Sequence, residues 1–238
     1  MNPPATISPP IQNSTSASSP SSAESVDPYV LRPNEARSLL AGADWKRFAV
    51  LGDSLAEGVG DTTDGYFTLS WADRVAAELA VPAYLNLGTE RLTAKAVERD
   101  QLEQAVAWRP DLVAVIAGGN DILSDDPDLY ETERALESIY RRSRESGADV
   151  VAFTLMDPSS IFGDERLARR IGALNSMIRH LSARVGVTLA DLAIRPFGDE
   201  RSIYSADLKH PNMRGHAIVA SAMIESLADL LRTKQGQF

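Results

Sequence analysis

Three polar residues have the types and the spacing that nucleophilic catalysis needs. Ser54 lies in the stretch "FAVLGDSLAEGVGD", where an apolar run gives way to a small polar turn. A serine hydroxyl is essentially un-ionised at neutral pH, so a nucleophilic serine needs a neighbouring base. His210, in "SADLKHPNMRGH", is a candidate for this base because Asp207 lies three residues before it. In a loop or a single turn, the carboxylate of Asp207 can reach one imidazole nitrogen and leave the other free to face a serine.

The segment around His210 also has a structural interpretation, as the entry to a last helix that Asn212 caps. The two interpretations are compatible, because such a cap would hold His210 in place. The other two histidines are weaker candidates. His180 lies inside a long helical stretch, and His216 falls one turn inside the last helix, so we expect structural or surface roles for both.

Asn120 is a candidate for stabilising the negative charge that acyl chemistry develops. It belongs to "AGGND", which follows the most continuous apolar segment of the chain. The adjacent glycines permit a tight turn, and the side-chain amide of Asn120 could donate to an oxyanion. Gly-Gly-Asn-Asp is also typical of ordinary turns, so the weight of this motif comes from where it lies in the fold.

The elements that must position these residues alternate between strand and helix. Continuous apolar runs predict strands, and helical periodicity that ends at Pro or Gly predicts helices. Strands are expected at 47–52, 83–88, 111–119, 148–155 and 187–192, and helices at 34–42, 69–80, 94–109, 128–146, 164–185 and 213–232, with a loop at 53–68. This alternation predicts an α/β protein with a doubly wound, five-stranded parallel sheet between two layers of helices.

Such a sheet would bring the candidate residues together. Right-handed crossovers place the loops that follow each strand at one edge of the sheet, and ligands bind at that edge. Ser54 follows the first strand, Asn120 follows the third, and His210 lies in the loop before the last helix. The topology therefore predicts one site made of these residues.

Composition excludes several other classes of function. The 238-residue chain has a formal net charge of −9, which disfavours binding to a nucleic-acid backbone. Its apolar runs are far shorter than the ~20 residues of a membrane span. Because it has no Cys, disulfides and thiolate chemistry are excluded. No metal-ligand spacing, P-loop or dinucleotide-binding motif is found, so no metal and no cofactor is expected.

The beginning of the chain differs in composition from the rest. Residues 1–28 are rich in Pro and Ser, which predicts a disordered tail before a domain at 29–238. Residues 1–31 contain no Lys or Arg and no apolar run typical of a secretory signal. We therefore expect a cytoplasmic protein.

With these residues in view, residues 45–232 resemble the SGNH hydrolase superfamily, also called GDSL esterases and lipases. The first block of that family resembles "GDSLAEG", the third "GGND" and the fifth "DLKHPNMRGH". The resemblance implies a flavodoxin-like three-layer α/β/α sandwich with Ser54 as nucleophile, His210 as general base and Asp207 orienting His210. It also implies an oxyanion hole made of the Ser54 N–H, the Asn120 side chain and an N–H from the second block.

The second block is where the chain departs from the family pattern. Relatives usually have Asn-Leu-Ala-x-x-Gly there, and that glycine donates its N–H to the oxyanion. In "NLGTERLTA" an ungapped register puts Arg91 at the glycine position, and using Gly88 instead would need a shift of three residues. Arg91 can still donate its N–H, but it has no easy access to a positive φ. Its cation either binds an anionic group of the substrate or points to solvent.

The sequence therefore predicts a serine esterase or deacylase that acts on a small soluble ester or acylated metabolite through an acyl-enzyme on Ser54. Two alternatives stay open. The same acyl-enzyme could pass its acyl group to an acceptor other than water, or the chain could be a catalytically impaired binding module on the same fold.

Overall fold

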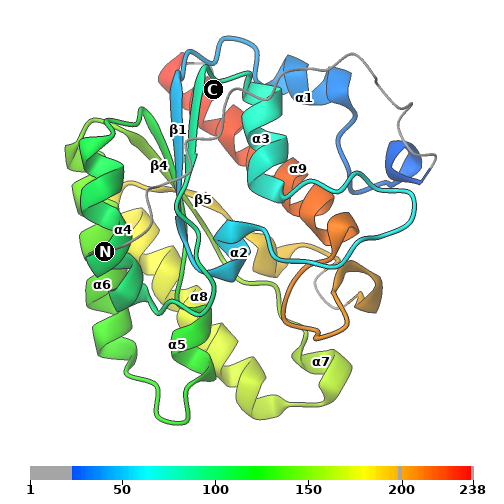
Figure 1. The fold of residues 1–238 in the computed structure, drawn as a ribbon, viewed down its shortest axis with the longest axis vertical. Helices are drawn as coiled ribbons and strands as arrows, with labels where there is room; N and C mark the ends of the chain where they lie inside the picture. The colour runs from blue at the N-terminus through cyan, green and yellow to red at the C-terminus, as the bar shows by residue number, and fades with distance from the viewer. Residues whose placement is uncertain (1–22, 198–199, 237–238) are drawn as a thin grey trace.

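The computed structural model of the chain describes residues 23–197 and 200–236. Its centre is a parallel sheet of five strands in the order β2-β1-β3-β4-β5 (Figure 1). The strands are β1 (Arg47–Gly52), β2 (Ala83–Asn86), β3 (Leu112–Ile116), β4 (Asp149–Phe153) and β5 (Thr188–Ala190). Each lies within a range where the sequence predicts a strand. The strand order reverses between β1 and β3, and in sheets of this kind ligands bind outside the carboxyl ends of such a pair.

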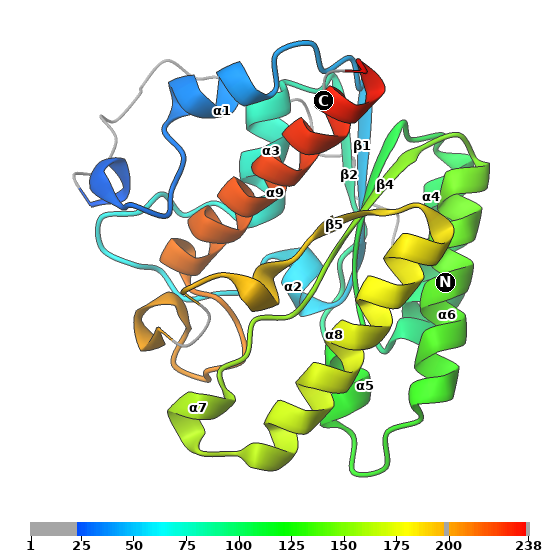
Figure 2. The same cartoon turned by 180° about the vertical axis from the view of Figure 1, so that it is seen from behind.

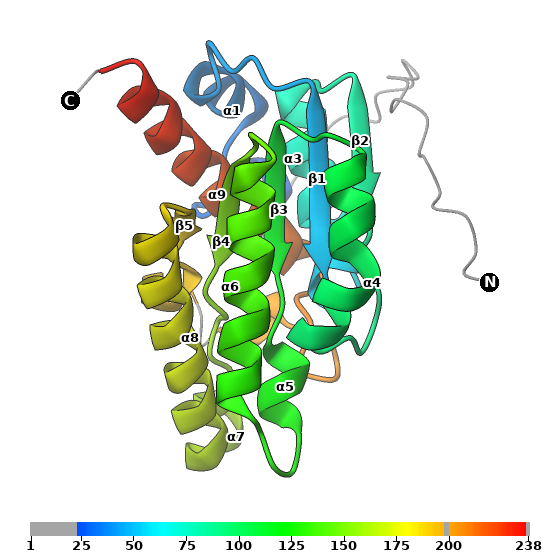
Figure 3. The ribbon, with the colours of Figure 1, turned by 90° about the vertical axis from the view of Figure 1, so that its left-hand side faces the viewer.

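Long helices cover both faces of the sheet, which confirms the predicted three-layer α/β/α sandwich (Figure 3). One layer contains α4 (Ala94–Ala107), α6 (Leu129–Glu145) and α8 (Glu165–Val185), and the other contains α1 (Pro33–Leu39), α3 (Trp71–Leu79) and α9 (Met213–Lys234). Side chains of Ser, Thr, Asp or Asn cap the first turns of α3, α4, α6, α8 and α9. These caps satisfy N–H groups that have no partner inside the helix.

The core has two halves, one on each face of the sheet. Every residue of β3 is buried, as expected for the middle strand of a parallel sheet. Phe48, Trp71 and Phe153 lie in the half under α3 and α9, and Leu51, Leu102 and Ile139 lie in the half under α4 and α6. A rigid sheet filled from both sides is a firm base for residues at its carboxyl edge.

Short elements at the carboxyl edge were not expected from the sequence. The segment predicted as a loop at 53–68 contains α2 (Ser54–Glu57), and α5 (Gly119–Leu123) and α7 (Ser159–Phe162) follow β3 and β4. The 3-10 turns η1 (Glu24–Val26), η2 (Leu192–Ile194) and η3 (Arg201–Ile203) complete the described elements. Helices of four or five residues are too short to show a period in the sequence.

The described part of the chain begins inside the segment that composition assigns to the tail. Residues 1–22 of that segment lie outside the described residues. Residues 23–28, in contrast, contact the domain: Glu24 forms an ion pair with Arg74, and Asp27 forms one with Arg214. Composition did not indicate this because the two acidic residues find their partners far away in the sequence.

Candidate active site

A sharp turn after β1 presents Ser54 at the carboxyl edge of the sheet. Gly52 has a φ of +149°, and a Cβ at this position would lie 1.9 Å from the carbonyl oxygen of Ile116 in β3. Only glycine fits there. Asp53 then caps α2 by accepting a hydrogen bond from the Leu55 N–H at 3.0 Å. Ser54 is the first residue of α2 and is 8% exposed.

Gln101 of α4 fixes this turn from beneath. Its side-chain oxygen accepts a hydrogen bond from the Gly52 N–H, and its side-chain NH2 donates to the Gly52 carbonyl, both at 2.8 Å. Gln101 is 4% exposed. A buried amide that pairs with both backbone groups of one residue holds that residue in a single conformation. The peptide that leads into Asp53 and Ser54 is thus held by the helix layer as well as by β3.

The loop that ends at α9 brings a histidine and an aspartate to the serine. The Oγ of Ser54 lies 2.8 Å from Nε2 of His210, and Nδ1 of the same ring lies 2.6 Å from an oxygen of Asp207. Figures 1 and 2 show this loop, in orange, beside α2 at the carboxyl edge of the sheet. The three residues that the sequence singles out therefore form one continuous line of hydrogen bonds.

Asp207 is held as an ionised acceptor by its own turn. Partial burial alone would raise the pKa of its carboxyl, but hydrogen bonds from the Lys209 N–H and from His210 outweigh burial and hold the pKa below its usual range. Leu208 takes a φ of +56°, which lets the N–H groups of Lys209 and His210 both point at Asp207. An ionised carboxylate accepts the proton on Nδ1, so Nε2 faces the serine as the acceptor.

Asn212 performs the capping role that the sequence indicates. Its side-chain oxygen accepts from the Gly215 N–H at 3.0 Å, and its NH2 donates to the carbonyls of Ser202 and Tyr204. The cap thus begins α9 two residues after His210. The cap and the contacts of His210 with Asp207 and Ser54 thus occur in the same segment, so the two interpretations are compatible.

Two residues that line the cleft described below have backbone N–H groups without an acceptor in the described chain. Among the hydrogen bonds of the described residues, neither the Ser54 N–H nor the Arg91 N–H has an acceptor. The Gly88 N–H, in contrast, donates to the side chain of Asn86 at 2.8 Å. Gly88 also packs against α2 so closely that a Cβ would lie 2.2 Å from the Glu57 nitrogen. Gly88 is therefore committed to packing, which leaves residue 91 with the free amide.

Arg91 takes the backbone conformation that a glycine would favour. Its φ is +65°, in the left-handed region, where a non-glycine residue is strained by about 1 kcal/mol. Its side chain is exposed and lines the cleft described below, and no ion pair of Arg91 is found in the described part of the chain.

Asn120 lies next to the turn that carries Ser54, at the start of α5. Its side-chain NH2 donates to the Leu92 carbonyl at 3.0 Å and lies 3.5 Å from an oxygen of Asp53. Burial, together with the nearby charge of Asp121, raises the pKa of Asp53 to about 7 against the opposing effect of the hydrogen bond from the Leu55 N–H. One N–H of Asn120 is thus held firmly and the other only loosely.

A cleft of about 410 Å³ opens over these residues. Ser54, Arg91, Asn120, Asp207 and His210 all line it. Most of the remaining lining is apolar and comes from both halves of the core, including Trp71, Ile116, Leu155, Ile171 and Val219. The sequence suggests that 61–68, 156–164 and 193–206 line this cleft; the second and third segments contribute Met156, Pro158 and Tyr204, and the first contributes none. The sequence also suggests Tyr204 and Arg195 as side chains that shape the cleft; Tyr204 lines it, whereas Arg195 forms an ion pair with Glu225 of α9.

The other two histidines lie outside the line of hydrogen bonds. His180 is exposed on α8. His216 is fully buried: Nδ1 accepts from the Trp71 N–H and Nε2 faces the Val59 carbonyl, each at 3.2 Å. Burial lowers the pKa of His216 to about 4, although the bond to Val59 opposes this. Within 23–197 and 200–236, no cluster of His, Asp or Glu could hold a metal ion, and no helix is long and apolar enough to cross a membrane.

Sequence reasoning missed Gln101, Asp53 and the Asp27–Arg214 pair. A glutamine in the middle of a helix carries no signal of its role, because what it binds is decided by the packing of α4 on β1. Asp53 does stand beside Ser54 in the sequence, and that position is a signal that could have been used. Arg214, the second residue of the last helix, has no sequence feature that links it to residue 27.

Comparison with known proteins agrees with this geometry. The family model described as GDSL-like lipase/acylhydrolase matches residues 50–218. Comparison with curated proteins gave no match.

Solved structures share the fold at low sequence identity. The acetylxylan esterase Axe2 from Geobacillus stearothermophilus has a TM-score of 0.63 at 18% identity, covering 76% of this chain and 94% of its own. An α/β hydrolase from the metagenome of Lake Arreo, LAE5, has a TM-score of 0.62 at 19% identity with the same coverage. A lipase from a goat rumen metagenome, Lip_vut3, has a TM-score of 0.62 at 18% identity, covering 76% of this chain and 96% of its own. Because the family model spans most of the chain and includes Ser54, Asn120, Asp207 and His210, the chain belongs to the GDSL-like lipase/acylhydrolase family.

Proposed function

We propose that the protein is a serine hydrolase that cleaves carboxylic esters through an acyl-enzyme on Ser54. The observation that carries this proposal is the unbroken line of contacts from Ser54 Oγ through His210 to Asp207, 2.8 and 2.6 Å long, at the floor of an open cleft. Family membership and the similarity of the fold to an acetylxylan esterase and a lipase support ester hydrolysis in general.

The chemistry follows from which atoms hold protons. Ser54 Oγ attacks the ester carbonyl carbon while its proton passes to Nε2 of His210, and Asp207 stabilises the imidazolium that forms. The tetrahedral intermediate then expels the alcohol, which takes the proton from Nε2, and the acyl group stays on Ser54. Water then attacks the acyl carbon while its proton passes to Nε2 of His210. The second tetrahedral intermediate expels Ser54 Oγ, which takes this proton back, and the acid is released.

Three donors are suited to hold the oxyanion of the intermediate. The N–H groups of Ser54 and Arg91 have no other acceptor in the described chain, and the loosely held N–H of Asn120 can turn from Asp53 towards the cleft. A donor of this kind contributes roughly 3 kcal/mol to the transition state. Arg91 supplies this amide from a left-handed conformation, as a glycine would.

The cleft favours a small ester with an apolar part. Its lining is mostly apolar and its volume, about 410 Å³, is that of a small-molecule site. The exposed guanidinium of Arg91 at this cleft supports a preference for esters that also carry an anionic group. We therefore propose that Arg91 binds substrate through its side chain as well as through its N–H.

A burst experiment tests the acyl-enzyme. With p-nitrophenyl acetate we expect a burst of p-nitrophenol equal to the enzyme concentration, followed by slower turnover, and labelling of Ser54 by a fluorophosphonate probe. Ser54→Ala should lower turnover by at least about 10³-fold. Ser143→Ala is the matched control, because Ser143 is also a buried serine but lies in α6, away from the cleft. Full turnover in Ser54→Ala, or no labelling of the wild-type serine, contradicts the proposal.

A further inference from the structure

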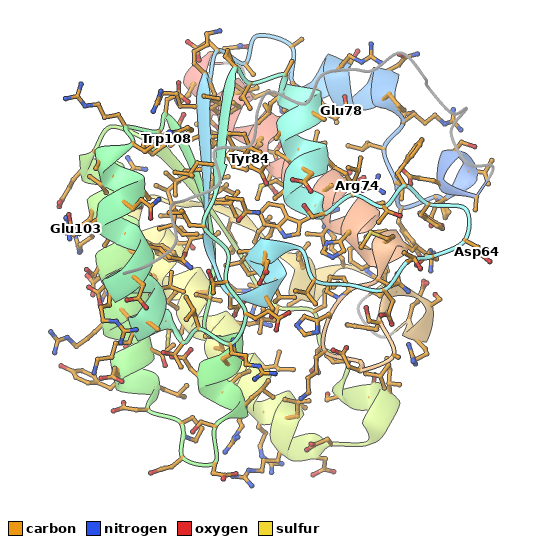
Figure 4. All side chains as sticks on the ribbon, viewed as in Figure 1. Asp64, Arg74, Glu78, Tyr84, Glu103 and Trp108 are labelled. Carbon is orange, nitrogen blue, oxygen red and sulfur yellow. The ribbon has the colours of Figure 1, made fainter. Side chains whose placement is uncertain are left out.

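Residues 23–31, here called the N-terminal strap, lie outside the part of the chain that the family model matches, yet they contact the histidine side of the site. The strap is held at its start by α3 and the loop before it. Glu24 forms an ion pair with Arg74 at 2.6 Å, and the side chains of both are only 11% exposed (Arg74 is labelled in Figure 4). Glu24 also accepts a hydrogen bond from the Phe67 N–H, and its own N–H donates to the Gly65 carbonyl.

The centre of the strap is a buried carboxylate, Asp27, whose side chain is 2% exposed. It accepts hydrogen bonds from the Tyr29 N–H, the Tyr66 hydroxyl and Nε of Arg214, the last at 2.7 Å. Burial alone would raise the pKa of Asp27, but the bonds from Arg214 and Tyr66 outweigh it and keep the pKa below its usual range. Asp27 is therefore a charged anchor.

Arg214 connects Asp27 to the loop that carries His210. From the first turn of α9, its Nη1 binds Glu200 at 2.9 Å and the Ser202 hydroxyl at 2.6 Å. One guanidinium thus ties the strap, the last helix and the start of the base loop. Arginine is suited to this because its planar fork holds several acceptors at fixed angles.

Apolar contacts make a second connection between the strap and the same loop. The ring of Tyr29 meets the ring of Phe197 edge-on, with the centroids 5.5 Å apart. Tyr29 and Val30 also pack on a small core of Ile203, Tyr204 and Ile218, separate from the two halves under the sheet. At the end of the strap, the Leu31 N–H donates to the Ser221 hydroxyl of α9.

The segment that the strap holds is itself paired with His210. Ser205 N–H donates to the His210 carbonyl at 2.8 Å, and Tyr204 forms a bridge with Pro211. Asn212 binds the carbonyls of Ser202 and Tyr204. A displacement of 202–205 would therefore displace His210. Within the described chain, this loop pairs with no strand of the sheet, and it is held by contacts with Asp61, by α9 and, through Arg214 and Tyr29, by the strap.

We propose that the N-terminal strap positions the catalytic base, and that Asp27 is a positioning residue that acts on His210 through Arg214. This inference rests on the proposed function of His210 as base. It assigns a role in catalysis to a part of the chain that lies before the region shared with the family. No strap residue lines the cleft, so the strap should affect the chemical step rather than substrate binding.

The test compares kcat and KM for p-nitrophenyl acetate in full-length variants, at a temperature where each is folded by circular dichroism. We expect Asp27→Asn to lower kcat roughly tenfold with KM within about twofold, because a small misplacement of a base costs rate. Tyr29→Leu, which keeps the apolar bulk but removes the ring contact with Phe197, should lower kcat by about two- to fivefold in the same way.

Asp149→Asn is the matched control. Asp149 ties the other end of α9, since it accepts from Nε1 of Trp45 and forms an ion pair with Lys234 at the opposite edge of the sheet. This variant loses a carboxylate that holds the same helix, so it reports what a purely structural loss does. We expect its kcat to stay within about twofold of wild type, even where its unfolding midpoint falls as far as that of Asp27→Asn.

A double-mutant cycle with Arg214→Gln completes the test. If Asp27 acts through Arg214, the double variant should be no slower than the slower single variant. An independent readout is the low-field proton resonance of the His210–Asp207 hydrogen bond, which should broaden in Asp27→Asn and stay sharp in Asp149→Asn. Unchanged kcat and an unchanged resonance in Asp27→Asn overturn the role of the strap. Loss of the proposed function would appear separately, as wild-type turnover that Ser54→Ala leaves intact.

Discussion

Ser54 lies at the end of a central strand, whereas His210 lies in a loop that pairs with no strand of the sheet in the described chain. The serine side is buried and is fixed by backbone contacts: Gly52 against Ile116 of β3, and Gln101 on both polar groups of Gly52. The histidine side is more open, with the side chain of Asp207 45% exposed. Its place depends on side chains that reach it from residue 27, from residue 61 and from α9.

The difference shows that one site can combine two ways of positioning. On the serine side, a substitution acts by collision or by leaving a buried polar group without a partner. On the histidine side, several contacts share the task, so we expect the domain to stay folded when one of them is removed.

Gln101→Leu should give the largest effect, because it removes two buried hydrogen bonds and leaves the Gly52 N–H without an acceptor. We expect the free energy of unfolding to fall by about 2–4 kcal/mol and kcat to fall by about 100-fold. Urea unfolding and kcat on p-nitrophenyl acetate measure the two effects. Gln104→Leu, on the exposed side of the same helix, is the control. A Gln101→Leu enzyme with normal kcat would show that Gly52 needs no support from α4.

His216 connects α9, on the histidine side, with the segment that follows α2, on the serine side: its ring accepts a hydrogen bond from the Trp71 N–H and faces the Val59 carbonyl. Protonation of this ring in acid should weaken that connection. With its pKa near 4 in the folded state, His216 stays neutral where an unfolded histidine is already protonated. The neutral His216 therefore contributes fully to the free energy of unfolding above about pH 6.5. This contribution falls as the pH drops, and at pH 4 about 3 kcal/mol of it is lost.

Asp53 also changes the free energy of unfolding over this pH range, and its raised pKa acts in the opposite direction to that of His216. Its protonated form is favoured by folding, so that its contribution is present at low pH and is lost as pH rises through about 7. Comparing wild type with His216→Gln in urea between pH 4 and 7 isolates the histidine, because Asp53 is common to both. Equal slopes in the two proteins would show that His216 is not the group responsible.

Asn212→Ala tests the histidine side alone. It removes the cap of α9 and the two bonds to the carbonyls of Ser202 and Tyr204. We expect a loss of about 1–2 kcal/mol in the free energy of unfolding and a drop in kcat smaller than that of Gln101→Leu. Asp164→Ala removes the cap of α8 and serves as the control for stability without a change in kcat. A drop in kcat as large as that of Gln101→Leu would contradict the view that the histidine side, unlike the serine side, is held by several contacts that share the task.

Arg91→Gly should have the smallest effect on the free energy of unfolding, and it should raise this free energy rather than lower it. Glycine takes a φ of +65° without strain. We expect a gain of up to about 1 kcal/mol, because relief of strain competes with the greater freedom of glycine in the unfolded chain. The N–H is kept, so kcat/KM for p-nitrophenyl acetate should stay within about twofold, while any preference for p-nitrophenyl hemisuccinate is lost. An unchanged ratio of kcat/KM for the two esters would contradict the proposed anion contact.

The sequence was sufficient for the sheet and for the order of its elements, because apolar runs and helical periods are long signals. It also predicted which residues meet, since Ser54 and His210 belong to motifs with a recognisable spacing. It could not predict α2 or α5, which are shorter than two turns. Nor could it predict Gln101 or the partner of Asp27, because these contacts arise only when distant segments pack and no local pattern carries them.

The contact between Asp27 and Arg214 affects the order in which the protein can fold during its synthesis. These residues are 187 positions apart, and Leu31 and Ser221 are 190 apart. During synthesis the first four strands of the sheet and the turn that carries Ser54 can form once α4 and then β4 are complete, because domains fold from the N-terminal side onwards. The loop that carries His210 can be fastened only after α9 has emerged. Under the proposed function, a nascent chain therefore has Ser54 in place before His210 can reach it, and we expect hydrolytic activity to begin only when the whole domain has folded.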